Sequence, residues 1–140
     1  IYADARKGKL DVSHCKTNPG KKEINPDVIH DFRDMDFDDN LFWHIVFDPP
    51  HIKNISLTSV LGFSYGSLNK ATWRDDLTKG FAECFRVLKP NGTLIFKWNE
   101  IQIPLKEVLS LTKFKPLYGH NSGKSAKTHW VAFIKNEEEI

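Results

Sequence analysis

The clearest chemical signal in this sequence is Val46-Phe47-Asp48-Pro49-Pro50-His51, in which a carboxylate precedes two prolines. Two consecutive prolines cannot continue a strand ladder and they restrict the local backbone, so we expect Asp48 at a rigid strand end. A carboxylate beside a backbone carbonyl without a ladder partner offers two acceptors, which suit the two N–H groups of a planar amine. The alternative interpretation is an ordinary tight turn after a strand, with Asp48 as a cap.

Two further acidic residues, Asp4 and Asp31, also follow short apolar runs. In a parallel sheet, ligands bind beyond the carboxyl ends of the strands. One such carboxylate would be commonplace, but three in succession predict a shared cleft formed by Asp4, Asp31 and Asp48. The alternatives are a surface carboxylate at Asp4 and a turn or capping acid at Asp31.

Hydrophobic periodicity and chain breakers indicate the elements that must position these residues. Apolar runs predict strands within 1–4, 27–31, 42–47 and 93–98. Apolar residues at three- and four-residue spacing predict a helix that begins after Thr72, with Asp75 completing a weak capping box. Lys89-Pro90-Asn91-Gly92 is expected to end this helix and turn the chain.

The remaining segments complete the predicted fold. Residues 5–26 are interpreted as a polar surface connection and residues 51–71 as a long loop. A short helix is expected near Pro104, followed by a final hairpin around residues 119–127. Strands that alternate with helical or long connections predict an α/β fold: a mostly parallel sheet covered on both faces, with a C-terminal antiparallel hairpin.

Three segments together resemble a known family. Residues 81–96 read FAECFRVLKPNGTLIF and are similar to the helix, turn and fifth strand of Rossmann-like S-adenosylmethionine-dependent methyltransferases, where RVLKPGG is common. Residues 31–42 resemble the third-strand segment of that family. Residues 48–51 resemble the DPPY motif of its amino-group branch, which methylates adenine N6 or cytosine N4. As a set, the match is closest to small phage- and prophage-type DNA methyltransferases.

The resemblance implies a cofactor site for S-adenosylmethionine. Asp4 matches the acidic residue that accepts hydrogen bonds from the cofactor ribose. Asp31 and Phe32 match the segment that meets the cofactor adenine, through the carboxylate and through the neighbouring backbone or ring. The first strand and the glycine-rich loop of the family have no counterpart in the sequence. We therefore expect residues 1–140 to form a single methyltransferase-like domain that is incomplete at its N-terminus.

The resemblance also implies a catalytic site made of Asp48, Pro49, Pro50 and His51. Asp48 and the Pro49 carbonyl would hold the target amine, and His51 takes the place of the aromatic residue that stacks on the target base. Histidine in place of tyrosine leaves the target base open. Besides DNA, the alternatives are RNA, a protein amide, or a non-catalytic Rossmann-like binding protein.

Nucleic acid, DNA in particular, is the expected partner. The candidates for substrate contact are two residues of the long loop, two at the end of the fifth strand and one in the hairpin: Lys53, Tyr65, Lys97, Asn99 and Lys124. Phosphate contacts by the lysines near the hairpin are plausible chemistry. The alternatives are a plain surface loop and a solvated lysine-rich surface.

Length and composition limit the other possibilities. The chain has 140 residues, of which 40% are hydrophobic and 27% charged, and its net charge is +2. These values suit one folded domain and neither require nor exclude a polyanionic partner. The sequence contains no apolar run long enough to cross a bilayer and no metal-ligand spacing, so we expect no membrane association and no metal. Two cysteines do not make a disulfide framework, so a cytoplasmic location is expected.

Overall fold

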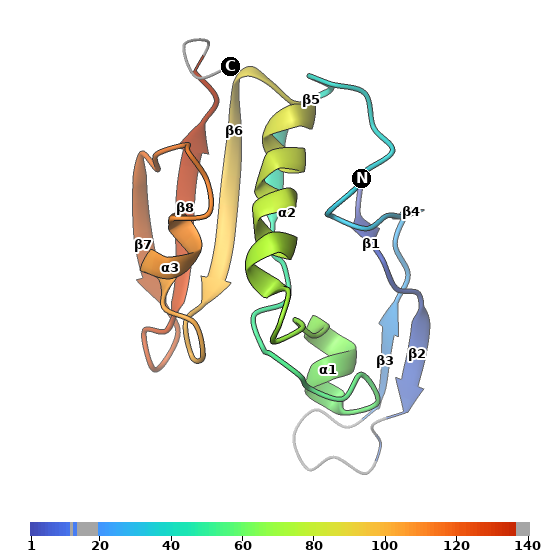
Figure 1. The fold of residues 1–140 in the computed structure, drawn as a ribbon. Coiled ribbons are helices and arrows are strands. Elements are labelled where there is room, and N and C mark those ends of the chain that lie inside the picture. The colour runs from blue at the N-terminus through green and yellow to red at the C-terminus, as the bar shows by residue number, and fades with distance from the viewer. Residues whose placement is uncertain (12, 14–19, 137–140) are drawn as a thin grey trace.

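A four-stranded sheet forms the centre of the computed structural model, which describes residues 1–11, 13 and 20–136 (Figure 1). In spatial order its strands are β5 (Phe42–Phe47), β6 (Leu88–Asn99), β8 (Thr128–Ile134) and β7 (Tyr118–Ser122). Strands β5 and β6 are parallel, whereas β8 is antiparallel to both β6 and β7. The sheet is therefore mixed: the predicted C-terminal antiparallel hairpin is confirmed, but of the predicted mostly parallel sheet only the β5–β6 pair is parallel here. The physical reason is that β7 and β8 form a hairpin that returns beside β6.

Two smaller sheets lie on the other side of β5. Strand β1 (Ala3–Asp4) pairs in parallel with β4 (Val28–Ile29), so the predicted short strands at both places are confirmed. Strands β2 (Gly8–Asp11) and β3 (Lys21–Ile24) pair in an antiparallel manner, which corrects the prediction that residues 5–26 are only a surface connection. These strands are short and lysine-rich and bury few side chains, so their sequence lacks a strong apolar alternation. Residues 12 and 14–19 of the predicted connection lie outside the described residues.

Helix α2 (Trp73–Val87) is the crossover connection between β5 and β6. Its apolar face is buried as predicted, with Leu77, Phe81, Cys84 and Phe85 in the core. Thr72 occupies the N-cap position, but its hydroxyl donates to Asp76 Oδ2 at 2.8 Å and caps no backbone N–H. Asp75 instead pairs with Lys79 at 2.8 Å, so the capping box does not form.

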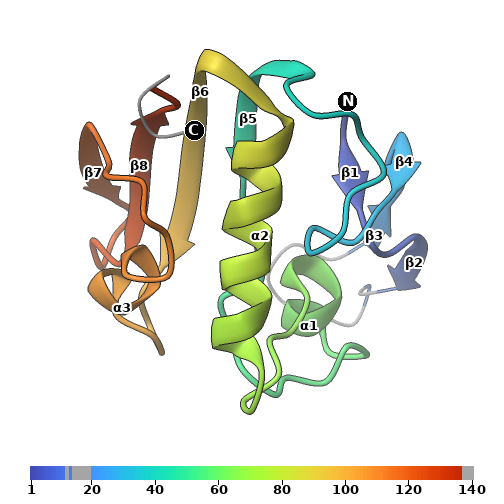
Figure 2. The same ribbon diagram turned by 45° about the horizontal axis from the view of Figure 1, so that its top comes forward.

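Helices α2 and α3 cover one face of the main sheet (Figure 2). Helix α2 and the short helix α3 (Leu105–Leu109), which begins after Pro104 as predicted, pack with the β6 residues Leu94, Phe96 and Trp98. Within the described part of the chain, no helix packs on the opposite face, so the prediction of a sheet covered on both faces is wrong. On that face Val46 is 57% exposed and Tyr118 is 69% exposed.

The segment after the double proline contains a helix that the sequence did not predict. Helix α1 (Val60–Tyr65) begins at Ser59, whose hydroxyl accepts from the Gly62 N–H at 3.0 Å, and ends at Gly66, whose φ is +74°. Six residues are too few to establish a helical period, which is why the pattern reads as a loop. Among the described residues, none of the helices is both long and apolar enough to span a bilayer.

Candidate functional site

Asp48 lies at the end of β5, where the prolines stop the strand as predicted. Strand register pairs Phe47 with Phe96, which places Lys97 beside Asp48, and the Lys97 Nζ donates to Asp48 Oδ2 at 2.7 Å. Among the described residues, Asp48 caps no backbone N–H, and its Oδ1 receives no hydrogen bond. The carboxylate is 45% exposed and lies at the rim of the sheet, so its second oxygen can accept from a ligand.

The double proline is held by helix α1. A Cβ atom at Gly66 would lie 2.9 Å from Pro50 Cγ, so the end of α1 packs directly on this turn. The carbonyl of Pro49 accepts no hydrogen bond from any residue that the structure describes. Two unused acceptors, Asp48 Oδ1 and the Pro49 carbonyl, therefore belong to neighbouring residues of one rigid turn.

His51 lies on the helix side of Asp48. Its ring centroid is 5.7 Å from that of Tyr65 and 6.3 Å from that of Trp98. Burial lowers the pKa of His51; the nearby Asp48 opposes this effect and Lys97 adds to it. The ring is therefore neutral at neutral pH and presents an aromatic surface next to the Asp48 carboxylate.

Asp4 is connected to the same end of the molecule through Arg6. The Arg6 guanidinium donates to both carboxylate oxygens of Asp4 at 3.1 Å and to the α1 carbonyl of Phe63 at 2.6 Å. The Arg6 Cζ and Pro50 Cγ atoms both lie against Gly66. The structure thus brings Asp4 and the Asp48-Pro49-Pro50 turn to one end, with Arg6 and α1 between them.

Asp31 and Phe32 face helix α2. Arg33 donates to both Asp31 oxygens and to Asp76 Oδ1 at 3.0 Å, and its hydrogen bonds to Asp31 lower the pKa of that carboxyl. The Phe32 ring packs against Phe47 at a centroid distance of 5.5 Å. Asp31 thus accepts hydrogen bonds within a local turn, as expected if it is only a turn or capping acid. Its role in cofactor binding stays a prediction.

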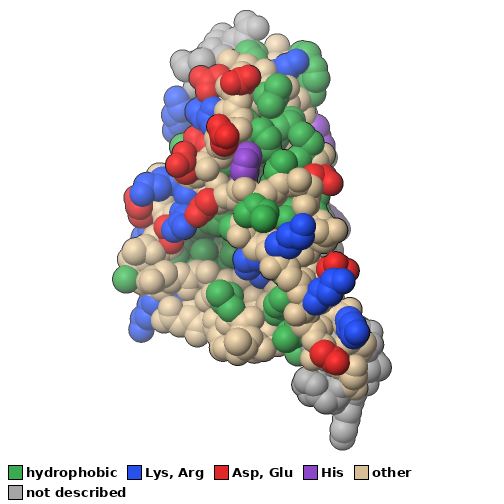
Figure 3. All heavy atoms as spheres, turned by 90° about the vertical axis from the view of Figure 1, so that its right-hand side faces the viewer, with side chains coloured by type: hydrophobic (Ala, Val, Ile, Leu, Met, Phe, Trp, Pro, Cys, Tyr) green, Lys and Arg blue, Asp and Glu red, His purple; other side chains and the backbone are tan. Residues whose placement is uncertain are grey.

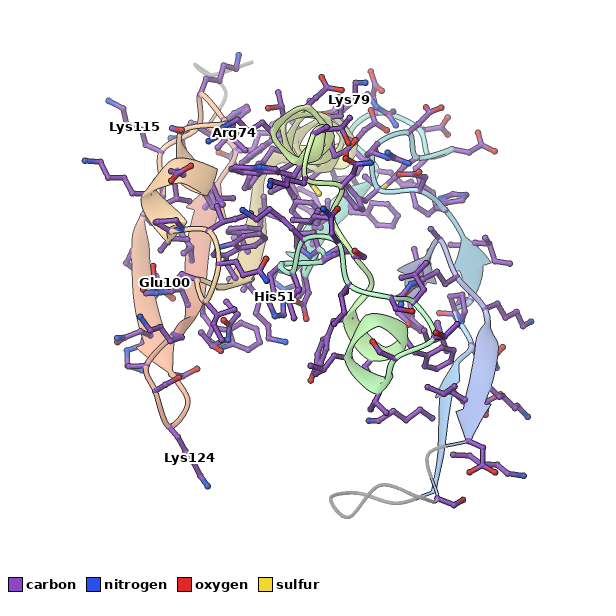
Figure 4. All side chains as sticks on the ribbon, turned by 60° about the horizontal axis from the view of Figure 1, so that its bottom comes forward. His51, Arg74, Lys79, Glu100, Lys115 and Lys124 are labelled. Carbon is purple, nitrogen blue, oxygen red and sulfur yellow. The ribbon has the colours of Figure 1, made fainter. Side chains whose placement is uncertain are left out.

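The predicted substrate residues divide into two groups. Tyr65 and Lys97 lie beside His51 and Asp48, and the Lys53 N–H donates to Gln102 Oε1 at 2.8 Å in the adjoining loop. Asn99 donates to Thr128 Oγ1 at 3.2 Å, between β6 and β8. Figure 4 shows Lys124 at the tip of the hairpin, pointing away from His51.

The structure adds residues that the sequence did not assign to this end. Arg6 links Asp4 to α1, and Trp130 lies beside Lys97, whose Nζ is 5.5 Å from the Trp130 ring centroid. His129 Nε2 lies 2.9 Å from Glu100 Oε1, and this contact lowers the pKa of the Glu100 carboxyl. No short-range sequence pattern marks Arg6, Trp130 or Glu100 for this end of the molecule.

Hydrophobic side chains are also exposed toward the β1–β4 side, which Figure 3 views. Ile1 and Ile29 are both exposed there. The predicted strand at 27–31 is thus present but is not buried within the described structure.

Comparison with known proteins gives similarity of fold only. No protein-family model and no curated protein sequence matches the chain. PH0226 of Pyrococcus horikoshii is similar with a TM-score of 0.55 and 18% identity, over 80% of this chain and 60% of that protein. TTHA0409 of Thermus thermophilus, a candidate DNA modification methylase, has a TM-score of 0.51 and 16% identity, over 76% of this chain and 52% of that protein. This chain therefore spans less than two thirds of either protein, and its mixed α/β fold is similar to that of a candidate DNA modification methylase.

Proposed function

We propose that this protein is an S-adenosylmethionine-dependent methyltransferase that methylates an exocyclic amino group, adenine N6 or cytosine N4, in DNA. The observation that carries the proposal is the pair of unused acceptors, Asp48 Oδ1 and the Pro49 carbonyl, on one rigid turn. The fold similarity to TTHA0409 supports the same broad class.

The two acceptors address the difficulty of the reaction. An exocyclic amine is a poor nucleophile because its lone pair is delocalised into the base. Two N–H groups that donate to Asp48 and to the Pro49 carbonyl favour a pyramidal nitrogen with a directed lone pair. His51 offers its neutral ring as a stacking surface for the base. The contribution of these residues is positioning and electrostatic stabilisation, and a base within a duplex must be flipped out to reach them.

The cofactor, when bound, supplies an electrophilic sulfonium methyl group. Asp4 has the chemistry to accept from ribose hydroxyls, but Arg6 and Tyr2 already fill its acceptor positions. The Tyr2 hydroxyl makes the longest of these contacts, at 3.3 Å, so we expect cofactor binding to displace it. Asp31 offers the second carboxylate, for the adenine amine. The Phe32 ring packs in the core, so its backbone is the part available to the base.

One observation favours a second candidate, a non-catalytic Rossmann-like binding protein. Lys97 holds one oxygen of Asp48, and Arg6 and Tyr2 occupy Asp4, so both carboxylates are partnered without a ligand. RNA and protein amides remain the alternative substrates, because any planar amino nitrogen presents the same two donors.

The decisive test is methyl transfer from labelled S-adenosylmethionine to unmethylated DNA, RNA and protein. We expect transfer to DNA, and we expect Asp48→Asn to lower kcat/KM by about 100-fold or more, because the amide carries no charge and, with its oxygen held by Lys97, turns an N–H donor toward the amine. Asp38→Asn is the matched control, since Asp38 is an exposed carboxylate in the loop before β5.

Two outcomes would contradict the proposal. Full transfer by Asp48→Asn would show that the amine does not bind at this turn. Calorimetric titration that detects no S-adenosylmethionine binding, together with no transfer to any substrate, would favour the binding protein instead.

A further inference from the structure

The uncovered face of the main sheet carries a continuous row of side chains that ends at Asp48. Strand register makes His120 on β7 the direct neighbour of Trp130 on β8, and Trp130 the direct neighbour of Lys97 on β6. Directly paired residues project on the same side of a sheet. The Lys97 Nζ then reaches Asp48 at 2.7 Å. The row thus connects the outer edge of the sheet to the candidate amine site.

Trp130 is exposed and yet held in position. Its side chain is 41% exposed, its indole N–H donates to Ser122 Oγ at 3.2 Å, and Lys97 lies over its ring. Because the indole is already held at its N–H and at its ring, it loses little conformational freedom when a planar group stacks on it. Trp130 is therefore suited to bind a planar group by stacking.

The charge of this sheet also restricts the partner. Strand register places Lys97, His44 and His120 on the uncovered face, and none of the strands β5, β6, β7 and β8 contains an aspartate or a glutamate. The hairpin turn between β7 and β8 adds Lys124 and Lys127. A face with aromatic rings, lysines and no strand carboxylate is complementary to a polyanion that carries flat, apolar groups. Single-stranded nucleic acid has this chemistry, because its phosphates attract lysines and its unpaired bases stack on aromatic rings.

We propose that single-stranded DNA lies across the uncovered face of β6, β8 and β7, with one base stacked on Trp130 and the adjoining target base at Asp48. The inference rests on the proposed function and adds to it the path of the substrate strand. A base paired within a duplex is already stacked on its neighbours, so Trp130 binds the strand only where it is unpaired.

The test measures binding of a fluorescein-labelled single-stranded oligonucleotide of about 12 nucleotides by fluorescence anisotropy, at about 50 and 200 mM salt. We expect Trp130→Ala to raise Kd about tenfold and Trp130→Phe to retain most of the affinity, because the phenyl ring still stacks. Trp43→Ala is the matched control: Trp43 is 64% exposed and also has a lysine over its ring, Lys89 at 4.7 Å, but it lies at the opposite end of β5. The Trp43→Ala variant should bind the oligonucleotide with the same Kd as the wild type.

Thermal melting of each variant separates lost binding from lost folding, and Trp130→Phe keeps the test valid if Trp130→Ala does not fold. Wild-type affinity in Trp130→Ala, or no binding by the wild type at either salt concentration, would overturn the stacking surface. Methyl transfer that still depends on Asp48 would leave the proposed function standing in that case. Conversely, Trp130-dependent binding without any methyl transfer would support the surface and contradict the enzyme.

Discussion

At the residue scale, the contact between Asp48 and Lys97 has a functional meaning more than a stabilising one. Both side chains are partly exposed, at 45% and 30%, and such pairs contribute about 0–1 kcal/mol to folding. An amine that binds Asp48 Oδ1 need not displace Lys97, because the lysine occupies the other oxygen. Lys97 therefore orients the Asp48 carboxylate and leaves its Oδ1 available to the amine.

His51 provides the clearest pH dependence. Burial lowers its pKa from the usual value of about 6.5, so below that pH the unfolded chain takes up a proton that the folded chain resists. The free energy of unfolding is therefore expected to fall as the pH decreases from about 6.5 toward the lowered pKa of the folded state. Urea denaturation at a series of pH values measures this slope.

Replacing His51 should remove this contribution. We expect His51→Gln to lose stability less steeply than the wild type over the same pH range. His120→Gln, which removes an exposed histidine on β7, serves as the control. An unchanged slope in His51→Gln would show that the ring is not buried enough to resist protonation.

At the element scale, helix α2 is closely packed at Gly80. A Cβ atom there would lie 2.6 Å from Phe32 Cδ2 and 2.8 Å from Phe47 Cζ. Gly80 thus allows the helix to contact both β5 and the segment after β4. Alanine is the better helix former by about 1 kcal/mol, so propensity and packing oppose each other at this position.

We predict that the packing effect at Gly80 is larger than the gain in helix propensity. Gly80→Ala should lower the free energy of unfolding by about 1–3 kcal/mol, because both aromatic rings must move. Urea denaturation measures the change, and Lys79→Ala, an exposed neighbour, should alter stability little. A higher free energy of unfolding in Gly80→Ala would show that the Phe32 and Phe47 rings can move without loss of stability.

The predictions of individual elements succeeded where the signal is local. Strand β5 and helix α2 follow from an apolar run ended by prolines and from a three- to four-residue period, and both are confirmed. The hairpin β2–β3 and helix α1 were missed, because short polar strands and a six-residue helix carry little periodicity. Helix α2 ends at Val87, just before residues 89–92 as predicted, but these residues belong to β6, where Asn91 has a φ of +62° and the register with β5 is irregular.

At the scale of the whole molecule, Arg86 ties the segment before β5 to the end of α2. Its guanidinium donates to the Met35 carbonyl at 2.8 Å, to the Phe37 carbonyl at 2.7 Å, and to Asp39 and Glu83. The resemblance of residues 86–92 to a methyltransferase turn therefore coincides with a structural role of this arginine. It fixes the approach to the strand that ends at Asp48.

Arg86→Met should therefore lower the free energy of unfolding by about 1–3 kcal/mol, since two carbonyls lose their donors. Arg74→Met, on an exposed position of the same helix, should cost less than about 1 kcal/mol. Chemical denaturation of both variants tests the difference. Equal effects would show that the carbonyls find other donors or water.

The sequence alone determined the local features of this protein: the strand that ends at Asp48, the amphipathic helix, the C-terminal hairpin and the rigid Asp-Pro-Pro turn. Proline geometry and hydrophobic period act over a few residues, so these features can be read from neighbours in the chain. Only the tertiary structure decided that Lys97 meets Asp48, that Arg6 holds Asp4, and that Trp130 lies beside Lys97 on an uncovered face. These contacts depend on strand order and register, which are set by packing between segments far apart in the sequence.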